Sequence, residues 1–228
     1  IMLTRVITTA LFAGFITGII AAILQFALIQ PLLLHAELFE NGTLTHFGDA
    51  GAGTTGHMVW LGLDPQRDLL SILFSAIIYT GYSFLLVAGI SLAAEQGHHI
   101  SPRSGLIWGF AGFIALHLAP AMGLPPELPG AGAADVAARQ VWWFGTVAAT
   151  ALGLWLIAFG KSPITWAIAV LALAIPHIIG APHPDLFTGP VPPELAAHFS
   201  ARAIGVGLVC WSILGLLAGY FWSKEADS

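Results

Sequence analysis

The chain has 228 residues, of which 57% are hydrophobic and only 8% are charged, and its mean hydropathy is +0.85. A soluble domain carries about 25% charged residues, so this composition excludes a soluble fold and indicates an integral membrane protein. The net charge of −5, with only 7 Lys and Arg residues, leaves no basic surface on which nucleic acid could dock. No phosphate-binding glycine loop is present either, and we expect no enzymatic activity.

Six apolar stretches approach the roughly 20 residues that a membrane-spanning helix needs. They lie at about 4–30, 69–94, 104–122, 140–160, 163–180 and 201–223. We predict an all-α, polytopic membrane protein with a single transmembrane domain over residues 1–228, built as three helical hairpins. Its long, proline-rich outer loops are predicted at about 31–68, 122–139 and 181–200. Because the third and fifth stretches are short and end in proline-rich sequence, five spans is the alternative.

The connections between these stretches set the expected orientation. Four basic residues fall at the short connections and chain ends: Arg5, Arg103, Lys161 and Lys224. Three fall at the long loops: Arg67, Arg139 and Arg202. Since basic residues favour the cytoplasmic side of a membrane, we expect both termini in the cytoplasm and the long loops outside.

One arrangement recurs at the three long loops. A histidine lies near a helix end, a Glu-Leu pair lies in the loop, and an arginine opens the next helix. The three copies are His35, Glu37-Leu38 and Arg67; His117, Glu127-Leu128 and Arg139; and His177, Glu194-Leu195 and Arg202. The arginines are expected to anchor helix ends or to pair with the glutamates, which would keep these carboxylates ionised.

Histidine and carboxylate side chains gather on the same predicted side. Neutral imidazole with carboxylates suits borderline divalent ions such as cobalt, nickel, zinc and copper. An ionisable residue at membrane depth is also a candidate for function, because burying it without a partner is costly. The predicted metal ligands are His117, His177, Glu127, Glu194, His35, Glu37, His183 and Asp185. The first loop also contains the histidines His46 and His57 and the acid Asp49.

A structural alternative exists for the two histidines placed near helix ends. His117 could instead hydrogen-bond a carbonyl freed by Pro120, and His177 one freed at a kink made by Pro176. The residues alone leave both interpretations open.

Three runs of sequence carry a family resemblance. Residues 31–40 (PLLLHAELFE), 117–130 (HLAPAMGLPPELPG) and 176–184 (PHIIGAPHP) resemble the CbtA family, a bacterial cobalt transporter subunit. The resemblance implies an inner-membrane protein for cobalt uptake in cobalamin biosynthesis. It also implies a partner, CbtB, a small subunit with one membrane span and histidines near one end. The chain departs from the expected pattern at His35, where an acid would stand, and this exchanges an oxygen ligand for nitrogen.

Together, these features predict a membrane subunit for uptake of a transition-metal cation. The outer carboxylates and histidines would capture divalent cobalt, or nickel, as substrate and pass it inward through successive partial sites, with no permanently bound cofactor. One alternative is a haem-binding membrane redox protein that uses His117 and His177 as axial ligands. Another is a scaffold subunit whose partner binds the metal. An oligomer is compatible with the sequence.

Overall fold

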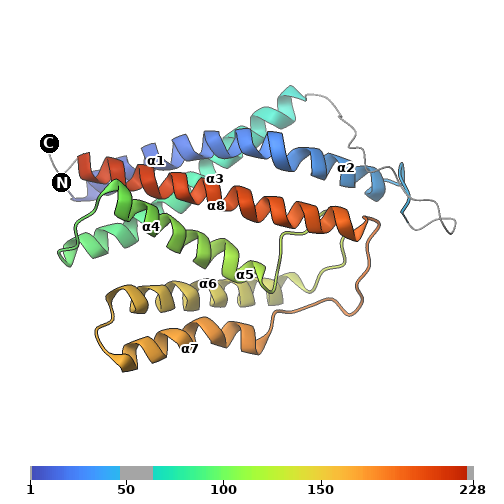
Figure 1. Cartoon of the computed structure of the whole chain (residues 1–228). Coiled ribbons are helices and arrows are strands. Elements are labelled where there is room, and N and C mark those ends of the chain that lie inside the picture. Colours follow the sequence, from blue (N-terminus) through green and yellow to red (C-terminus); the bar gives the residue numbers. More distant parts are fainter. Residues whose placement is uncertain (1, 47–63, 225–228) are drawn as a thin grey trace. The chain divides into compact units, whose positions relative to one another are not determined.

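The computed structural model describes residues 2–46 and 64–224, and within these residues every regular element is helical (Figure 1). This confirms the predicted all-α fold. The α-helices are α1 (Met2–Leu24), α2 (Gln30–Glu40), α3 (Pro65–Glu95), α4 (Pro102–Phe113), α5 (Ala119–Ala121), α6 (Val136–Phe159), α7 (Pro163–Ile179) and α8 (Pro193–Lys224). Two π-helical segments, η1 (Gln25–Ile29) and η2 (Ile114–Leu118), join α1 to α2 and α4 to α5 without a break.

Within residues 2–46 and 64–224, five helical runs are long and apolar enough to cross a membrane, which confirms a polytopic membrane protein. They are Met2–Glu40, Pro65–Glu95, Pro102–Ala121, Val136–Phe159 and Pro193–Lys224. Helix α7 is apolar but has only 17 residues, which is the lower limit of the range for a spanning helix.

The chain forms two compact units, and each is described separately. Among the described residues, the first unit comprises 2–28, 64–113 and 205–224, and the second comprises 29–46 and 114–204. Helix α8 contributes residues to both units. The expectation of one transmembrane domain stays a prediction.

The first unit is held together by glycines at helix contacts. A Cβ atom added to Gly14 of α1 would lie 2.4 Å from the Thr80 Cα atom of α3. In the same way, a Cβ on Gly105 of α4 would lie 2.3 Å from the backbone oxygen of Gly215 in α8. Small residues therefore let these helix backbones touch, as is typical of helix association in membranes.

The two ends of the described chain meet in this first unit. The Arg5 guanidinium donates from Nε to the Trp222 carbonyl oxygen at 3.1 Å and lies 4.2 Å from the centre of the Trp222 ring. The start of α1 and the end of α8 therefore lie on one side of the membrane, which requires an even number of crossings. Because five long helices give an odd number, this contact favours a sixth crossing by α7.

In the second unit, α6 and α7 pack against each other as a hairpin (Figure 1). The Trp142 indole Nε1 of α6 donates to the Pro176 carbonyl oxygen of α7 at 3.0 Å. Segments α5 and η2 also pack against α6. The π-helical segment thus contacts the hairpin through α6.

Candidate functional site

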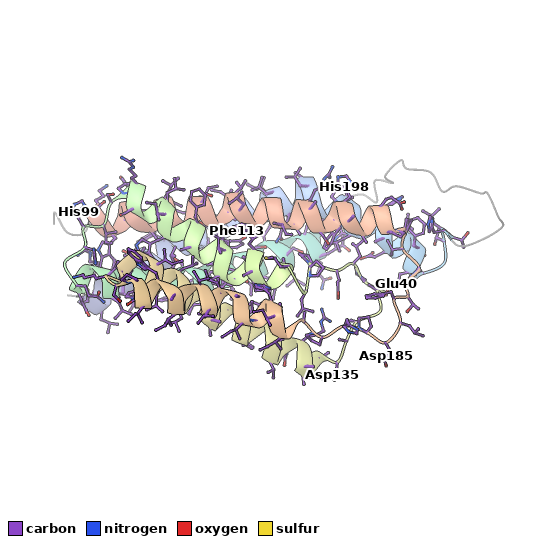
Figure 2. All side chains as sticks on the ribbon, turned by 60° about the horizontal axis from the view of Figure 1, so that its bottom comes forward. Glu40, His99, Phe113, Asp135, Asp185 and His198 are labelled. Atoms are coloured by element: carbon purple, nitrogen blue, oxygen red, sulfur yellow. The ribbon has the colours of Figure 1, made fainter. Side chains whose placement is uncertain are left out.

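All eight predicted metal ligands lie in the second unit. His35 and Glu37 lie on α2, His117 on η2 and His177 on α7. Glu194 lies in the first turn of α8. Glu127 lies in the connection after α5, and His183 and Asp185 lie in the connection after α7. Figure 2 shows three acids of this unit, Glu40, Asp135 and Asp185, at one end of it. Asp49 and His57 lie outside the described residues.

Two proline-rich connections, residues 122–135 and 180–192, are fastened to each other and to α8. The Gly132 N–H donates to the Thr188 carbonyl oxygen at 2.7 Å, which joins the two connections. The Ser200 hydroxyl of α8 donates to the Pro126 carbonyl oxygen. These contacts place the loop that carries Glu127 beside the loop that carries Asp185.

Gly130 lies at the contact between the two connections and the end of α2. Its φ of +80° lies in the left-handed region, and an added Cβ would come within 3.3 Å of Pro190 Cδ and 3.5 Å of Glu40 Cγ. The C-terminal end of α2 therefore meets both connections at Gly130. Glycine is suited to this position because it adopts positive φ at little cost and leaves space for the neighbouring chain.

Glu127 is held in one orientation by an ion pair. Arg139 Nη2 of α6 donates to Glu127 Oε2 at 3.0 Å, and the two side chains are 30% and 33% exposed. The helix that supplies Arg139 begins at Asp135, whose carboxylate accepts from the Ala138 N–H at 3.0 Å. One carboxylate oxygen of Glu127 is thus engaged, and its partly exposed position leaves the carboxylate accessible from solvent.

His117 lies in the π-helical segment η2 and is half-buried. A π-helix widens one turn of the helix and is often found at functional sites. His117 therefore lies on a segment that packs against α6, the helix that also packs against α7.

His177 lies near the end of α7, against the edge of the Trp142 ring of α6. The two ring centres are 6.1 Å apart, and the ring planes are inclined by 73°. The carbonyl oxygen of Pro176 already accepts from Trp142 Nε1 and from the Gly180 N–H at 3.1 Å. These contacts fix the tryptophan and give the half-buried imidazole a defined aromatic neighbour.

His35 is the most buried of the predicted ligands, with 4% of its surface exposed. Its ring packs edge-on against Phe39, with ring centres 5.5 Å apart. In the part of the chain that the structure describes, its Nδ1 atom has no hydrogen-bond partner. It therefore keeps an unused nitrogen inside the second unit.

The predicted three-copy pattern is matched in full only by its second copy. In the first copy, α2 continues to Glu40, so His35 and Glu37 lie on a helix, and the predicted loop from residue 31 is wrong by ten residues. In the third copy, α8 begins at Pro193, so Glu194 lies in its first turn and Arg202 lies inside the helix instead of opening it. The physical reasons differ: Pro193 stands at the start of α8, where proline is well tolerated, whereas Pro31 follows the π-helical segment η1 and does not interrupt the helix.

The remaining predicted residues lie mostly at the surface. Glu37, His183, Asp185 and Glu194 are exposed, and His183 Nδ1 contacts its neighbour's carbonyl oxygen, that of Pro184, at 3.2 Å. Arg67, in the first turn of α3 in the first unit, pairs with the adjacent Asp68 at 3.0 Å. Across residues 2–46 and 64–224, no group of three or more His, Cys, Asp or Glu residues is placed to hold a metal ion together.

Two residues of interest were not identified from the sequence. Thr146 and Thr150 lie on the buried face of α6, together with Gly153. Their spacing of four residues inside an apolar helix was the available signal, but it also fits ordinary helix packing.

The fold defines a polytopic membrane protein whose second unit carries exposed and partly exposed carboxylates together with buried and half-buried imidazoles. The model of the family described as "Probable cobalt transporter subunit (CbtA)" matches residues 3–223, and the chain belongs to this family. This confirms the family resemblance and the expected class, a membrane protein of cobalt transport. No curated protein matches the chain. No solved structure matches it either.

Proposed function

We propose that this chain captures divalent cobalt on the acidic side of its second unit and passes it inward as part of an uptake system. The observation that carries the proposal is the Glu127 carboxylate, which Arg139 orients on a loop fastened to two neighbouring segments. A carboxylate fixed in this way can attract a hydrated dication without a large entropic cost of ordering. The same unit also carries the exposed acids Glu37, Asp185 and Glu194.

Passage then requires nitrogen ligands behind the acids. His117 and His177 lie on two segments, η2 and α7, that both pack against α6. Transport needs binding that is weak enough to release the ion, so successive partial sites suit it better than one tight cage. In this proposal, water completes the coordination of the ion at each step, and three protein ligands are not needed at once.

The proposal places the protein in the bacterial inner membrane, with both termini in the cytoplasm. Its partner would be a small single-span subunit of the CbtB type, whose histidines deliver or receive the metal. The membrane potential would favour inward movement of a cation by about 2.3 kcal/mol per charge for each 100 mV.

Cobalt binding to the purified chain tests the proposal. We expect saturable binding by calorimetry, with absorption bands of Co²⁺ bound to nitrogen and oxygen, and a loss of at least ~10-fold in affinity in His117→Ala and His177→Ala. His99→Ala, at an exposed histidine of the first unit, is the matched control and should bind like the wild type. Unchanged cobalt uptake by cells that express the double variant His117→Ala/His177→Ala would contradict the proposal.

The same samples separate the two alternatives. A haem protein would show a Soret band in the absorbance spectrum of the purified chain. A scaffold subunit would bind no cobalt alone but would support uptake together with its partner.

A further inference from the structure

Helix α6 carries polar side chains on its buried face and apolar ones on its exposed face. Its fully buried residues are Thr146, Thr150 and Gly153, whereas Val141 and Phe144 are 75% and 65% exposed. Lipid favours the apolar exposed face, and small residues, threonine included, suit the packed inner face of a membrane helix. A hydroxyl on this inner face can serve a ligand as well if packing leaves it without a hydrogen bond.

The two threonines differ in how their hydroxyl groups are used. Thr146 Oγ1 donates to the Trp142 carbonyl oxygen of its own helix at 2.8 Å, the usual internal bond of a threonine in a membrane helix. Thr150 is 1% exposed, and its Oγ1 atom has no hydrogen-bond partner among the residues that the structure describes. Leaving a buried hydroxyl unsatisfied is unfavourable, so this oxygen is available to a ligand that enters the bundle.

The surroundings of this face connect it to the candidate site. The segment η2, which carries His117, packs against α6. The face itself lies against α7, since a Cβ on Gly153 would come within 3.1 Å of the Ala169 carbonyl oxygen. Thr150 is one turn further along α6 than Thr146 and two turns further than Trp142, which contacts His177. It therefore lies further along α6 than the contact with His177, on the helix that both histidine-bearing segments contact.

We propose that Thr150 is an inner ligand for the transported cation, which reaches its hydroxyl oxygen from His117 with part of its water shell. This inference rests on the proposed function and adds a ligand to it. A neutral hydroxyl holds a divalent ion less strongly than a carboxylate or an imidazole does. It therefore suits a step at which the ion must be released towards the cytoplasm.

Isosteric replacement of the hydroxyl tests this role. Thr150→Val in the full-length chain, expressed with its partner subunit, should lower the initial rate of radioactive Co²⁺ uptake at least fivefold. Its melting temperature in detergent should stay the same or rise, because an unsatisfied buried hydroxyl is removed. Thr150→Ser should keep uptake near the wild-type rate. Thr146→Val is the matched control: its hydroxyl bonds to the helix itself, so uptake should be retained.

Two outcomes would overturn the inference: wild-type uptake in Thr150→Val, or an equal loss in Thr150→Val and Thr146→Val. If the valine variant does not fold, Thr150→Ala and Thr150→Ser replace it, and equal uptake by these two variants would contradict the role. The variant His117→Ala/His177→Ala separates this inference from the proposed function. Loss of uptake there, with full uptake in Thr150→Val, rejects only the inner ligand, whereas full uptake in the histidine variant rejects the proposed function itself.

Discussion

Glu127 illustrates, at the scale of single residues, how a side chain becomes available to a cation. Its loop is rigid because of its prolines, and Arg139 holds one carboxylate oxygen at 3.0 Å. Both side chains are about one third exposed, so the pair is partly screened by water. Such pairs contribute little to stability, about 0–1 kcal/mol, which suggests that the value of this pair lies in orientation.

We therefore predict that Glu127→Gln separates binding from stability. Cobalt affinity should fall about fivefold, which corresponds to roughly 1 kcal/mol for a partly exposed charge, while the melting temperature changes little. Calorimetry with Co²⁺ and a thermal-shift assay measure the two quantities. Glu95→Gln, an exposed acid at the end of α3, is the control and should alter neither. An equal effect of the two substitutions would argue for nonspecific attraction.

Gly130 offers a second prediction at this scale. An alanine there must adopt a φ of +80° and place its Cβ near Pro190 and Glu40, so Gly130→Ala should cost about 1 kcal/mol or more. Gly145→Ala in α6 is the control: nothing lies within 4 Å of the added Cβ, and alanine favours helix. The melting temperature should fall in the first variant and stay the same or rise in the second. Equal melting temperatures would mean that the loop junction is not strained by a side chain.

The sequence could predict some of these residues but not their surroundings. The Glu127 and Arg139 arrangement follows from a proline-rich loop directly before a helix, which is a local signal. The burial of His35 beside Phe39 depends on which face of α2 packs inward, and the chain's hydropathy does not reveal this because the helix is apolar on most sides. The orphan hydroxyl of Thr150 depends on contacts from other segments and has no local signature.

At the scale of elements, the main differences between expectation and structure occur at prolines. The first apolar stretch is predicted to end at about residue 30, but the helix continues past Pro31, which stands in the first turn of α2 directly after η1. A π-helical turn changes the hydrogen-bond register, so the chain can accept proline and continue as a helix. Pro193 begins α8 and is followed by an acid, a combination typical of a helix start. Glu37 and Glu194 therefore lie on helices and not in the predicted loops.

Contacts between α4 and α8 provide a prediction for elements. Gly109 has no room for a side chain, since an added Cβ would lie 2.3 Å from the backbone oxygen of Trp211. Because backbone atoms cannot yield as flexible side chains do, Gly109→Ala should destabilise the first unit by about 1–3 kcal/mol. The control is Gly81→Ala in α3, where nothing lies within 4 Å of the added Cβ. Limited proteolysis in detergent should show faster cleavage only for the first variant, and equal rates would contradict the close contact.

At the scale of the whole molecule, the number of crossings decides which residues face the same side. Hydropathy predicted the positions of the long helices well, because a lipid-exposed helix must be apolar along most of its length. It could not decide between five and six spans, since α7 is at the lower limit of spanning length. The contact between Arg5 and Trp222 supplies the missing constraint, as it brings the first and last helix ends to one side.

Six crossings with cytoplasmic termini lead to a direct test by cysteine labelling. Asp185→Cys should react with a membrane-impermeant maleimide in intact cells, and His99→Cys should react only after lysis, because the two positions then lie on opposite sides. Both side chains are exposed. The wild-type chain is the control, since its only cysteine, Cys210, is buried and should remain unlabelled. The reverse labelling pattern would invert the orientation and direct the candidate site towards the cytoplasm. Labelling of both positions from the same side would instead mean that α7 does not cross the membrane.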